Sequence, residues 1–290
     1  MREKIFLLLA VIFWGWSFVF TKILLDYVSP LELMGLRFII GLPFIFLVTR
    51  AKKIKLQFDS KDYLRILLGG LVITFHFFIQ ISGVKFTSAT NTGWIISVTP
   101  LILAVLSYLF LKEKIGRNTV IGIIVATLGI LLLVSNGNLS DIGWLSSYGD
   151  WLVLVSAHTW AIFTVITRDI SRKYNPLAVT LAILVPSAVL TTSYMIFTSD
   201  WTKFISLPPE PMISLFILGI LCLGTAHWFW QEGVAKFGAT KAGIFLYLEP
   251  IATTLLAVPY LHEQFTMFTA VGGILVLLGV YLANMKTKSL

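Results

Sequence analysis

Five ionisable side chains lie deep inside long apolar segments of this sequence, and they are Arg37, His76, His158, His227 and Glu249. Such a group is costly inside a bilayer unless it faces a cavity or a partner. Glu249 precedes Pro250, and a proline leaves the carbonyl four residues earlier without its hydrogen bond. We therefore expect an opened or kinked helix at Phe245 and Leu246. Glu249 is predicted to anchor a substrate or to couple protons, and the structural alternative is an ion pair with Arg37.

Arg37 has the right chemistry to bind a substrate carboxylate, although it could instead brace neighbouring helices. By residue count, His76 and His158 fall near the middle of their segments. A histidine there could relay protons near neutral pH, and we expect both to line a cavity. The alternative is a neutral imidazole bonded to a backbone oxygen. His227 falls closer to the end of its segment and is a weaker candidate.

Two tryptophans, Trp14 and Trp160, occupy corresponding mid-segment positions. Indoles that face one cavity could stack on an aromatic substrate or enclose an organic cation, whereas packing against lipid or protein is the alternative. Trp16 points away from Trp14, because residues two positions apart along a helix are separated by about 200° of rotation. Gln80 shares a helix face with His76 at i, i+4 spacing. The further binding candidates are Ser17, Asn91, Trp94 and Tyr247.

Composition shows where these residues must lie. The chain is 57% hydrophobic and 12% charged, with a mean hydropathy of +0.90. Soluble proteins carry roughly twice that share of charge. The apolar runs have about the 20-residue length of a membrane-spanning helix. The sequence therefore predicts an all-α integral membrane protein with ten transmembrane helices, at 5–25, 30–49, 64–83, 88–111, 118–135, 149–168, 175–198, 211–232, 241–261 and 266–285.

Lys and Arg are distributed unequally between the two sides of these predicted spans. With the N-terminus in the cytoplasm, eighteen of the 22 basic residues fall in cytoplasmic breaks. Only Lys22, Lys85 and Lys203 fall on the other side, and Arg37 lies within a span. The positive-inside rule then places both termini in the cytoplasm and the chain in the cell membrane. The net charge of +8 indicates no nucleic-acid partner, because the basic residues lie at segment ends.

The chain contains an internal repeat with an offset of 150 residues. The stretch 83–93 matches 233–243, and the match continues from Pro100, Glu113, Gly122 and Leu128-Gly129 to Pro250, Glu263, Gly272 and Leu278-Gly279. Five spans per half is an odd number, so the second half must cross the membrane in the opposite sense. The sequence thus predicts two inverted five-helix repeats, 1–137 and 138–290, with a substrate site between them. The matched glycines predict close helix packing.

The order and spacing of several short motifs resemble the EamA family of the drug/metabolite transporter superfamily over the whole chain. These motifs are Trp14–Phe18, Arg37-Phe38, Thr99–Leu101, Leu111–Glu113, Trp160-Ala161 and Tyr247–Pro250. The resemblance implies transport of small molecules, mostly export of metabolites such as amino acids, with no cofactor. It also implies a central cavity lined by the first four helices of each half, with the fifth and tenth helices peripheral.

We therefore interpret the chain as a secondary transporter that exports an amino acid or related metabolite by alternating access, with a proton or other cation as coupling ion. Transport of an organic cation through an aromatic-lined site is one alternative, and an integral membrane enzyme that modifies lipids is another. Phosphate-loop, zinc-protease and serine-elbow motifs are absent, so no catalytic or metal site is expected. The single Cys222 excludes an intrachain disulfide and, like the rest of the sequence, does not indicate the oligomeric state.

Overall fold

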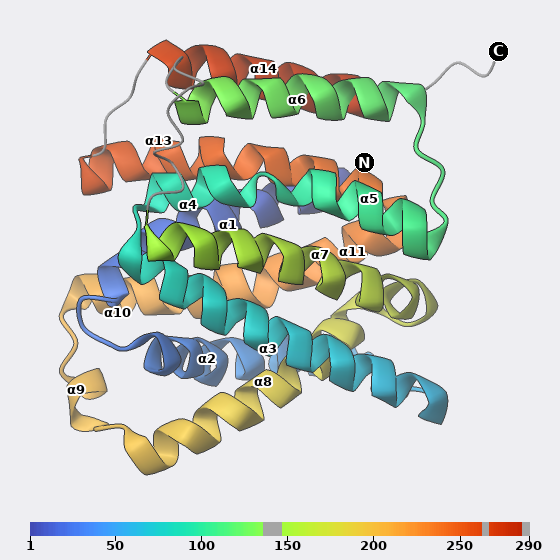
Figure 1. Ribbon diagram of the computed structural model, residues 1–290. Coiled ribbons are helices and arrows are strands. Elements are labelled where there is room, and N and C mark those ends of the chain that lie inside the picture. The colour runs from blue at the N-terminus through green and yellow to red at the C-terminus, as the bar shows by residue number, and fades with distance from the viewer. Residues whose placement is uncertain (136–146, 263–266, 286–290) are drawn as a thin grey trace.

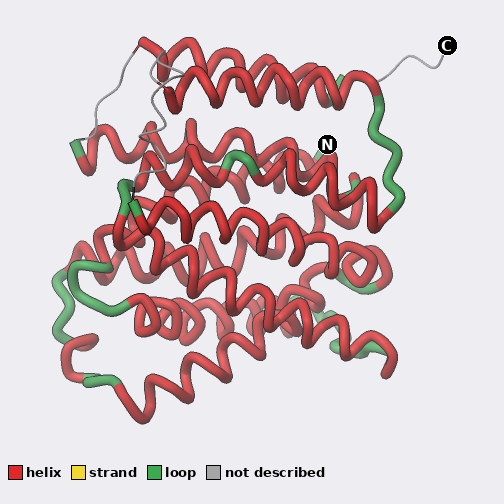
Figure 2. Tube along the Cα trace, in the orientation of Figure 1, coloured by secondary structure: helices red, strands yellow, loops and turns green. Residues whose placement is uncertain are grey.

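The computed structural model describes residues 1–135, 147–262 and 267–285, which form helices and connecting turns (Figure 1). Within these ranges there is no strand, as Figure 2 shows. Eight helical segments are long and apolar enough to cross a membrane: Arg2–Leu24, Pro30–Ala51, Ser60–Phe86, Ala89–Leu111, Tyr148–Lys173, Pro176–Thr198, Pro209–Phe237 and Ala239–Leu261. Two apolar helices, α6 (Arg117–Ser135) and α14 (Met267–Ala283), are shorter. The predicted all-helical class is confirmed.

Local sequence signals fix where several helices begin. The α2 helix (Pro30–Ala51) starts behind Ser29, which forms a capping box with Glu32. The α8 helix (Pro176–Thr198) starts behind Asn175, whose side chain accepts a hydrogen bond from Leu177. Each also has a proline in its first turn, where the missing N–H costs nothing. Both turn-plus-proline starts were predicted. The α1 (Arg2–Leu24) and α7 (Tyr148–Lys173) helices also cover predicted spans.

Two of the membrane-length segments are interrupted at equivalent points. The first consists of α4 (Ala89–Ile96) and α5 (Thr99–Leu111), separated by a turn. The second consists of α12 (Ala239–Gly243), a 3-10 turn over Ile244–Leu248, and α13 (Glu249–Leu261). The opening predicted at Phe245 and Leu246 is this 3-10 turn, so that prediction is confirmed. The helix after each interruption begins with a residue followed by proline, Thr99-Pro100 in α5 and Glu249-Pro250 in α13. A proline has no backbone N–H, so it cannot donate a hydrogen bond to the turn before it.

The third and eighth predicted spans also have internal structure. A short 3-10 turn (Ser60–Asp62) leads into α3 (Tyr63–Phe86). The eighth span contains α10 (Pro209–Phe216), a π-helical stretch (Ile217–Thr225) and α11 (Ala226–Phe237). The sequence did not predict the π-helical stretch. A small helix, α9 (Thr202–Ile205), lies between α8 and α10.

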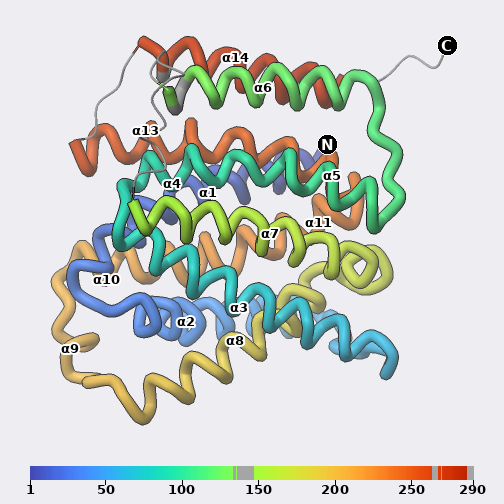
Figure 3. The backbone as a smooth tube through the Cα atoms, viewed as in Figure 1, coloured from blue at the N-terminus to red at the C-terminus, as the bar shows by residue number. Residues whose placement is uncertain are grey.

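The helices are arranged so that α6 and α14 lie side by side along one edge of the bundle (Figures 1 and 3). Gly122 lies against Gly279, and Gly129 lies against Gly272, so the two helices run antiparallel. This is the close packing that the matched glycines predicted. Within the rest of the bundle, α3 packs on α7, α1 packs on α11 and α13, and α2 packs on α8. One large apolar core joins these helices.

Candidate functional site

A central cavity lies where α1, α2, α3, α7, α11 and the two interrupted segments meet. Its lining mixes charged, hydrogen-bonding and aromatic side chains, and none comes from α6 or α14. The lining residues are Trp14, Ser17, Phe18, Arg37, His76, Phe77, Gln80, Ile96, Thr99, Trp160, His227, Leu246 and Glu249.

Two ionisable side chains, one basic and one acidic, lie on this cavity without forming an ion pair. Arg37 and Glu249 are each only 4% exposed. Within the described residues no ion pair joins them, and neither side chain has a hydrogen-bond partner in the protein. The Arg37 guanidinium carbon lies 5.1 Å from the centroid of the Phe77 ring. The ion pair that we considered as the structural alternative is therefore not present.

The two histidines on the cavity are oriented by backbone carbonyls. His76 Nδ1 donates to Ser156 O at 3.0 Å, and His227 Nδ1 donates to Cys222 O at 3.2 Å. A neutral imidazole that donates through Nδ1 keeps a lone pair on Nε2. His227 Nε2 is buried and has no partner among the described groups. Each ring is thus oriented to accept a proton or a substrate donor through Nε2.

The indoles form an aromatic wall of the same cavity. Trp14 and Trp160 meet edge to face, with ring centroids 4.7 Å apart and planes at 78°. The ring centroid of Trp160 also lies 5.1 Å from that of His76 and 5.6 Å from that of His227. Trp14 Nε1 donates to Cys222 O at 3.0 Å, whereas Trp160 Nε1 is buried without a partner. The wall therefore offers aromatic surface and a free indole donor.

The π-helical stretch supplies the carbonyl that holds this wall in place. Cys222 lies in that stretch, and its carbonyl accepts from both Trp14 and His227. The Cys222 thiol in turn donates to Phe13 O at 3.1 Å. A π-bulge shifts the helical hydrogen-bonding register and is frequent at functional sites. Here the bulge ties α11 to α1 beside the cavity.

Four of the predicted binding residues lie elsewhere. His158 is exposed and donates to Leu154 O, so the expectation that it lines the cavity is wrong. It precedes Trp160 by two residues, about 200° of helix, and Trp160 faces inward. Trp94 and Tyr247 line a separate apolar cavity, where Tyr247 bonds Thr127. Asn91 lies in the first turn of α4, and its side-chain amide donates a hydrogen bond to Asp150.

The central cavity also contains residues that the sequence analysis did not select. His227, which the sequence analysis treated as a weaker candidate near a span end, also lines the cavity. Ile96 and Thr99 line the cavity from the first half, and Leu246 and Glu249 line it from the second. These are repeat-related pairs, 150 residues apart. Given Glu249, the same offset could have identified Thr99, and Leu246 and Ile96 each lie about one helical turn earlier.

The arrangement can bind and orient an amphipathic solute. A guanidinium and a carboxyl group are positioned for opposite charges, and the indoles are positioned for an apolar group. Within the described part of the chain no cluster of three His, Cys, Asp or Glu side chains could hold a metal ion.

Known proteins resemble this chain along nearly its whole length. The model of the EamA-like transporter family matches residues 1–135 and 147–285. An uncharacterized transporter of Archaeoglobus fulgidus is 30% identical over 99% of this chain and 100% of its own. A Salmonella typhimurium protein named "Probable amino-acid metabolite efflux pump" is 25% identical over 97% of this chain and 94% of its own. A crystal structure with 20% identity shares the fold, with a TM-score of 0.78 over 98% of both chains.

Proposed function

Because the chain belongs to the EamA-like transporter family, we propose that it is a secondary transporter for a small organic zwitterion, an amino acid or related metabolite. The observation that carries this proposal is a buried basic and a buried acidic side chain on one cavity, Arg37 and Glu249, neither with a polar partner among the described residues. A buried charge without a partner is strongly unfavourable, and a solute that carries the complementary charge relieves that cost. A zwitterion supplies both complementary charges at once.

In the proposed complex, the substrate carboxylate binds Arg37 and its ammonium group binds Glu249. Arginine suits this role because its planar fork of donors matches a carboxylate. The apolar part of the substrate lies against Trp14 and Trp160, whose rings already meet edge to face. The free donor of Trp160 and the Nε2 acceptor of His227 offer further polar contacts. Charge thus selects the substrate class, and the aromatic wall selects its side chain.

We further propose ten membrane spans, α6 and α14 included, in two inverted five-helix repeats, 1–137 and 138–290. The family model matches once in each half. The packing of α3 on α7 has its counterpart in α11 on α1, and α2 packs on α8 as α6 packs on α14. The antiparallel contact of α6 and α14 agrees with opposite insertion of the halves. Inverted repeats around a central site are typical of alternating-access carriers.

The proposed direction is export across the cell membrane, with both termini in the cytoplasm. The name of the Salmonella typhimurium relative, an efflux pump, supports export. The excess of Lys and Arg at one end of the predicted spans supports the orientation. Glu249 is the only carboxyl group among the residues that line the cavity, and we propose that it also couples protons to transport.

An organic cation is the second candidate substrate, because the two indoles could enclose one. Arg37 counts against it, since a guanidinium on the same cavity would repel a cation without a carboxylate. A zwitterion satisfies both charges, whereas a cation satisfies one.

A matched set of solutes separates these candidates. Purified protein in liposomes is loaded with phenylalanine, and counterflow of labelled phenylalanine, phenethylamine and 3-phenylpropanoate is measured. These solutes share a phenyl group and differ in charge. We expect phenylalanine alone to exchange. Equal exchange of phenethylamine would favour the organic-cation function, and failure of a full panel of amino acids would refute the zwitterion proposal. Mass spectrometry of the recovered solute tests the enzyme alternative, because a transporter returns it chemically unchanged.

A further inference from the structure

A second cavity lies at the end of the bundle where α5 and α7 end and α12 begins. It is separate from the central cavity, with which it shares no lining residue. Its walls come from the α5–α6 connection, the last turns of α7 and α11, and the start of α12. The lining residues are Glu113, Lys114, Ile115, Thr119, Arg168, Arg172, Ala235, Lys236, Phe237, Gly238, Thr240 and Lys241.

The charge on this cavity is strongly unbalanced. Five cationic side chains line it, against the single carboxylate of Glu113. That carboxylate is already occupied, because it accepts from the backbone N–H groups of Ala239 and Thr240, each at 3.0 Å, and lies 3.3 Å from Arg168. The remaining cations, which are Lys114, Arg172, Lys236 and Lys241, form no ion pair within 4 Å in the described part of the chain. Like charges gathered on one cavity repel, so an anion placed among them is stabilised.

The floor of this cavity also has polar groups that lack a partner. Thr240 is only 5% exposed, and its hydroxyl has no hydrogen-bond partner. Arg168 Nε is buried and is likewise unpartnered. Both residues line the cavity, so an anion bound there would bring an acceptor close to these two donors. A general excess of basic residues at one side of a membrane does not require a cavity with unpartnered donors at its base.

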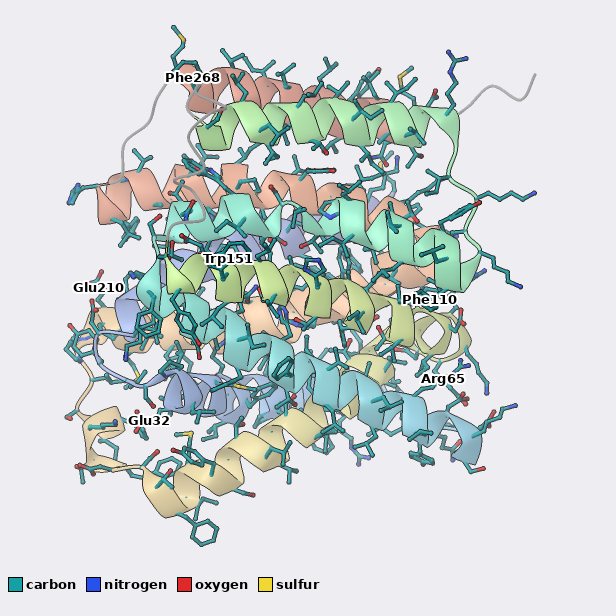
Figure 4. All side chains as sticks on the ribbon, in the orientation of Figure 1. Glu32, Arg65, Phe110, Trp151, Glu210 and Phe268 are labelled. Carbon is teal, nitrogen blue, oxygen red and sulfur yellow. The ribbon has the colours of Figure 1, made fainter. Side chains whose placement is uncertain are left out.

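We propose that this cavity binds a phosphate-bearing anion. Phosphate oxygens accept from guanidinium, ammonium and hydroxyl donors, all of which are present here. The surroundings favour an anionic lipid headgroup as the source. Leu109 and Phe110, at the adjoining end of α5, are 60% and 69% exposed and form an apolar surface that acyl chains would cover (Figure 4). Basic pockets between membrane helices bind lipid phosphates in this way.

Binding here would hold the two halves of the chain together at this end. Lys114 belongs to the first half, whereas Arg172, Lys236 and Lys241 belong to the second. Glu113 already bridges from the first half to α12 and Arg168. An anion between Lys114 and the cations of the second half adds to that connection, so its binding stabilises the assembled bundle.

The experiment measures thermal unfolding of the full-length protein in a neutral detergent. Phosphatidylglycerol, phosphatidylcholine and inorganic phosphate are each added to the parent protein. The test variant is Arg172→Gln/Lys236→Gln/Lys241→Gln, and the control is Lys53→Gln/Lys55→Gln/Lys61→Gln, which removes the same charge from the α2–α3 connection. We expect phosphatidylglycerol to raise the midpoint of the parent and the control by roughly 5 °C, and to leave the test variant unchanged.

The other outcomes are equally informative. Stabilisation by inorganic phosphate, lost in the test variant, would support the site with a soluble anion as its source. No stabilisation by either anion, or an equal loss in the test and control variants, would overturn the proposal. If the triple variant does not fold, Thr240→Val keeps every charge and removes only the unpartnered hydroxyl. Native mass spectrometry of that variant should show fewer retained phosphatidylglycerol molecules than the parent, and equal retention would overturn the proposal.

Discussion

At the scale of single residues, the Glu249 carboxyl group has no partner in the described protein, although it is almost fully buried. We predict that Glu249→Gln weakens binding of a zwitterion more than tenfold, because a hydrogen bond to a charged group contributes about 1.5–3 kcal/mol. Isothermal titration and counterflow measure the effect. Glu232→Gln is the matched control, since Glu232, in the middle of α11, accepts from Trp228 and does not line the central cavity.

Two other results for Glu249→Gln would change its role. Normal binding and counterflow with loss of proton-driven accumulation would make Glu249 a coupling group alone. If binding, counterflow and accumulation are all normal, then Glu249 is structural and the main site assignment is wrong.

The aromatic wall provides a second prediction at this scale. Trp160→Ala should weaken substrate binding by roughly 1–2 kcal/mol, because a desolvated aromatic contact is lost. Substrate should also change the tryptophan fluorescence of the parent protein. Trp151→Ala is the control, because Trp151 lies on the outer face of α7 and is 55% exposed (Figure 4). Unchanged affinity in a well-folded Trp160→Ala protein would make Trp160 a packing residue.

The sequence predicted a large part of this cavity because the relevant residues are chemically unusual in apolar segments. Arg37 and Glu249 stand out in any hydropathy analysis, and the Glu249-Pro250 pair also predicted the local opening of the helix. His158 was misplaced because residue count gives depth in the membrane and not the direction of a side chain. His227 was undervalued for a different reason: the predicted span ended at 232, whereas the helical segment continues to Phe237, so the residue lies deeper than expected.

At the scale of helices, the two interrupted segments show how the repeat is used. Their breaks place Thr99 and Glu249 at matching positions on one cavity. The helices that follow also end alike, since Lys112 and His262 both adopt the left-handed conformation, with φ of 53° and 54°. One half therefore presents a hydroxyl group where the other presents a carboxyl group, so only one half carries a titratable group at this position.

Helix bounds were predictable to within a few residues, except at two kinds of position. The α7 helix continues to Lys173, past the predicted end at 168, because its last turn is polar and hydropathy does not register it. The π-helical stretch depends on contacts of Cys222 with α1, which local sequence does not encode. Glu263 and the predicted boundary between the repeats, at 137–138, lie outside the described residues.

The contact between α6 and α14 yields a prediction with an internal control. A Cβ atom at Gly279 would lie 2.5 Å from Ala126 N and 2.6 Å from Gly122 O, so the helices would have to separate. We predict that Gly279→Ala destabilises the protein by about 1–3 kcal/mol, the usual cost of overpacking. Gly273→Ala should be neutral or slightly stabilising, because a Cβ there meets nothing within 4 Å.

Thermal unfolding of both glycine variants measures this effect. Substrate affinity should stay unchanged in each, since neither helix lines the central cavity. Equal midpoints for Gly279→Ala and Gly273→Ala would show that the two helices are not held at this distance in the membrane.

At the scale of the whole molecule, the charges separate along the bundle. The connections at one end carry most of the basic residues, and Figure 4 places Arg65 at this end and Glu32 and Glu210 at the other. The same end contains the basic cavity lined by Arg172 and Lys236. The central cavity lies between the two ends, which is the position expected for the proposed alternating-access carrier.

This separation of charge leads to a prediction about orientation. Both termini and the α2–α3 connection should face the cytoplasm, where basic residues concentrate. Single cysteines at Lys53 and Glu210, both exposed and at opposite ends, should therefore react from opposite sides with an impermeant thiol reagent. Cys222→Ala supplies the background, since the native thiol is fully buried. In intact cells we expect Glu210→Cys to label and Lys53→Cys to label only after the cells are opened. Labelling of both from outside would refute the inverted ten-span topology. Two halves inserted in the same sense would place these two connections on the same face of the membrane.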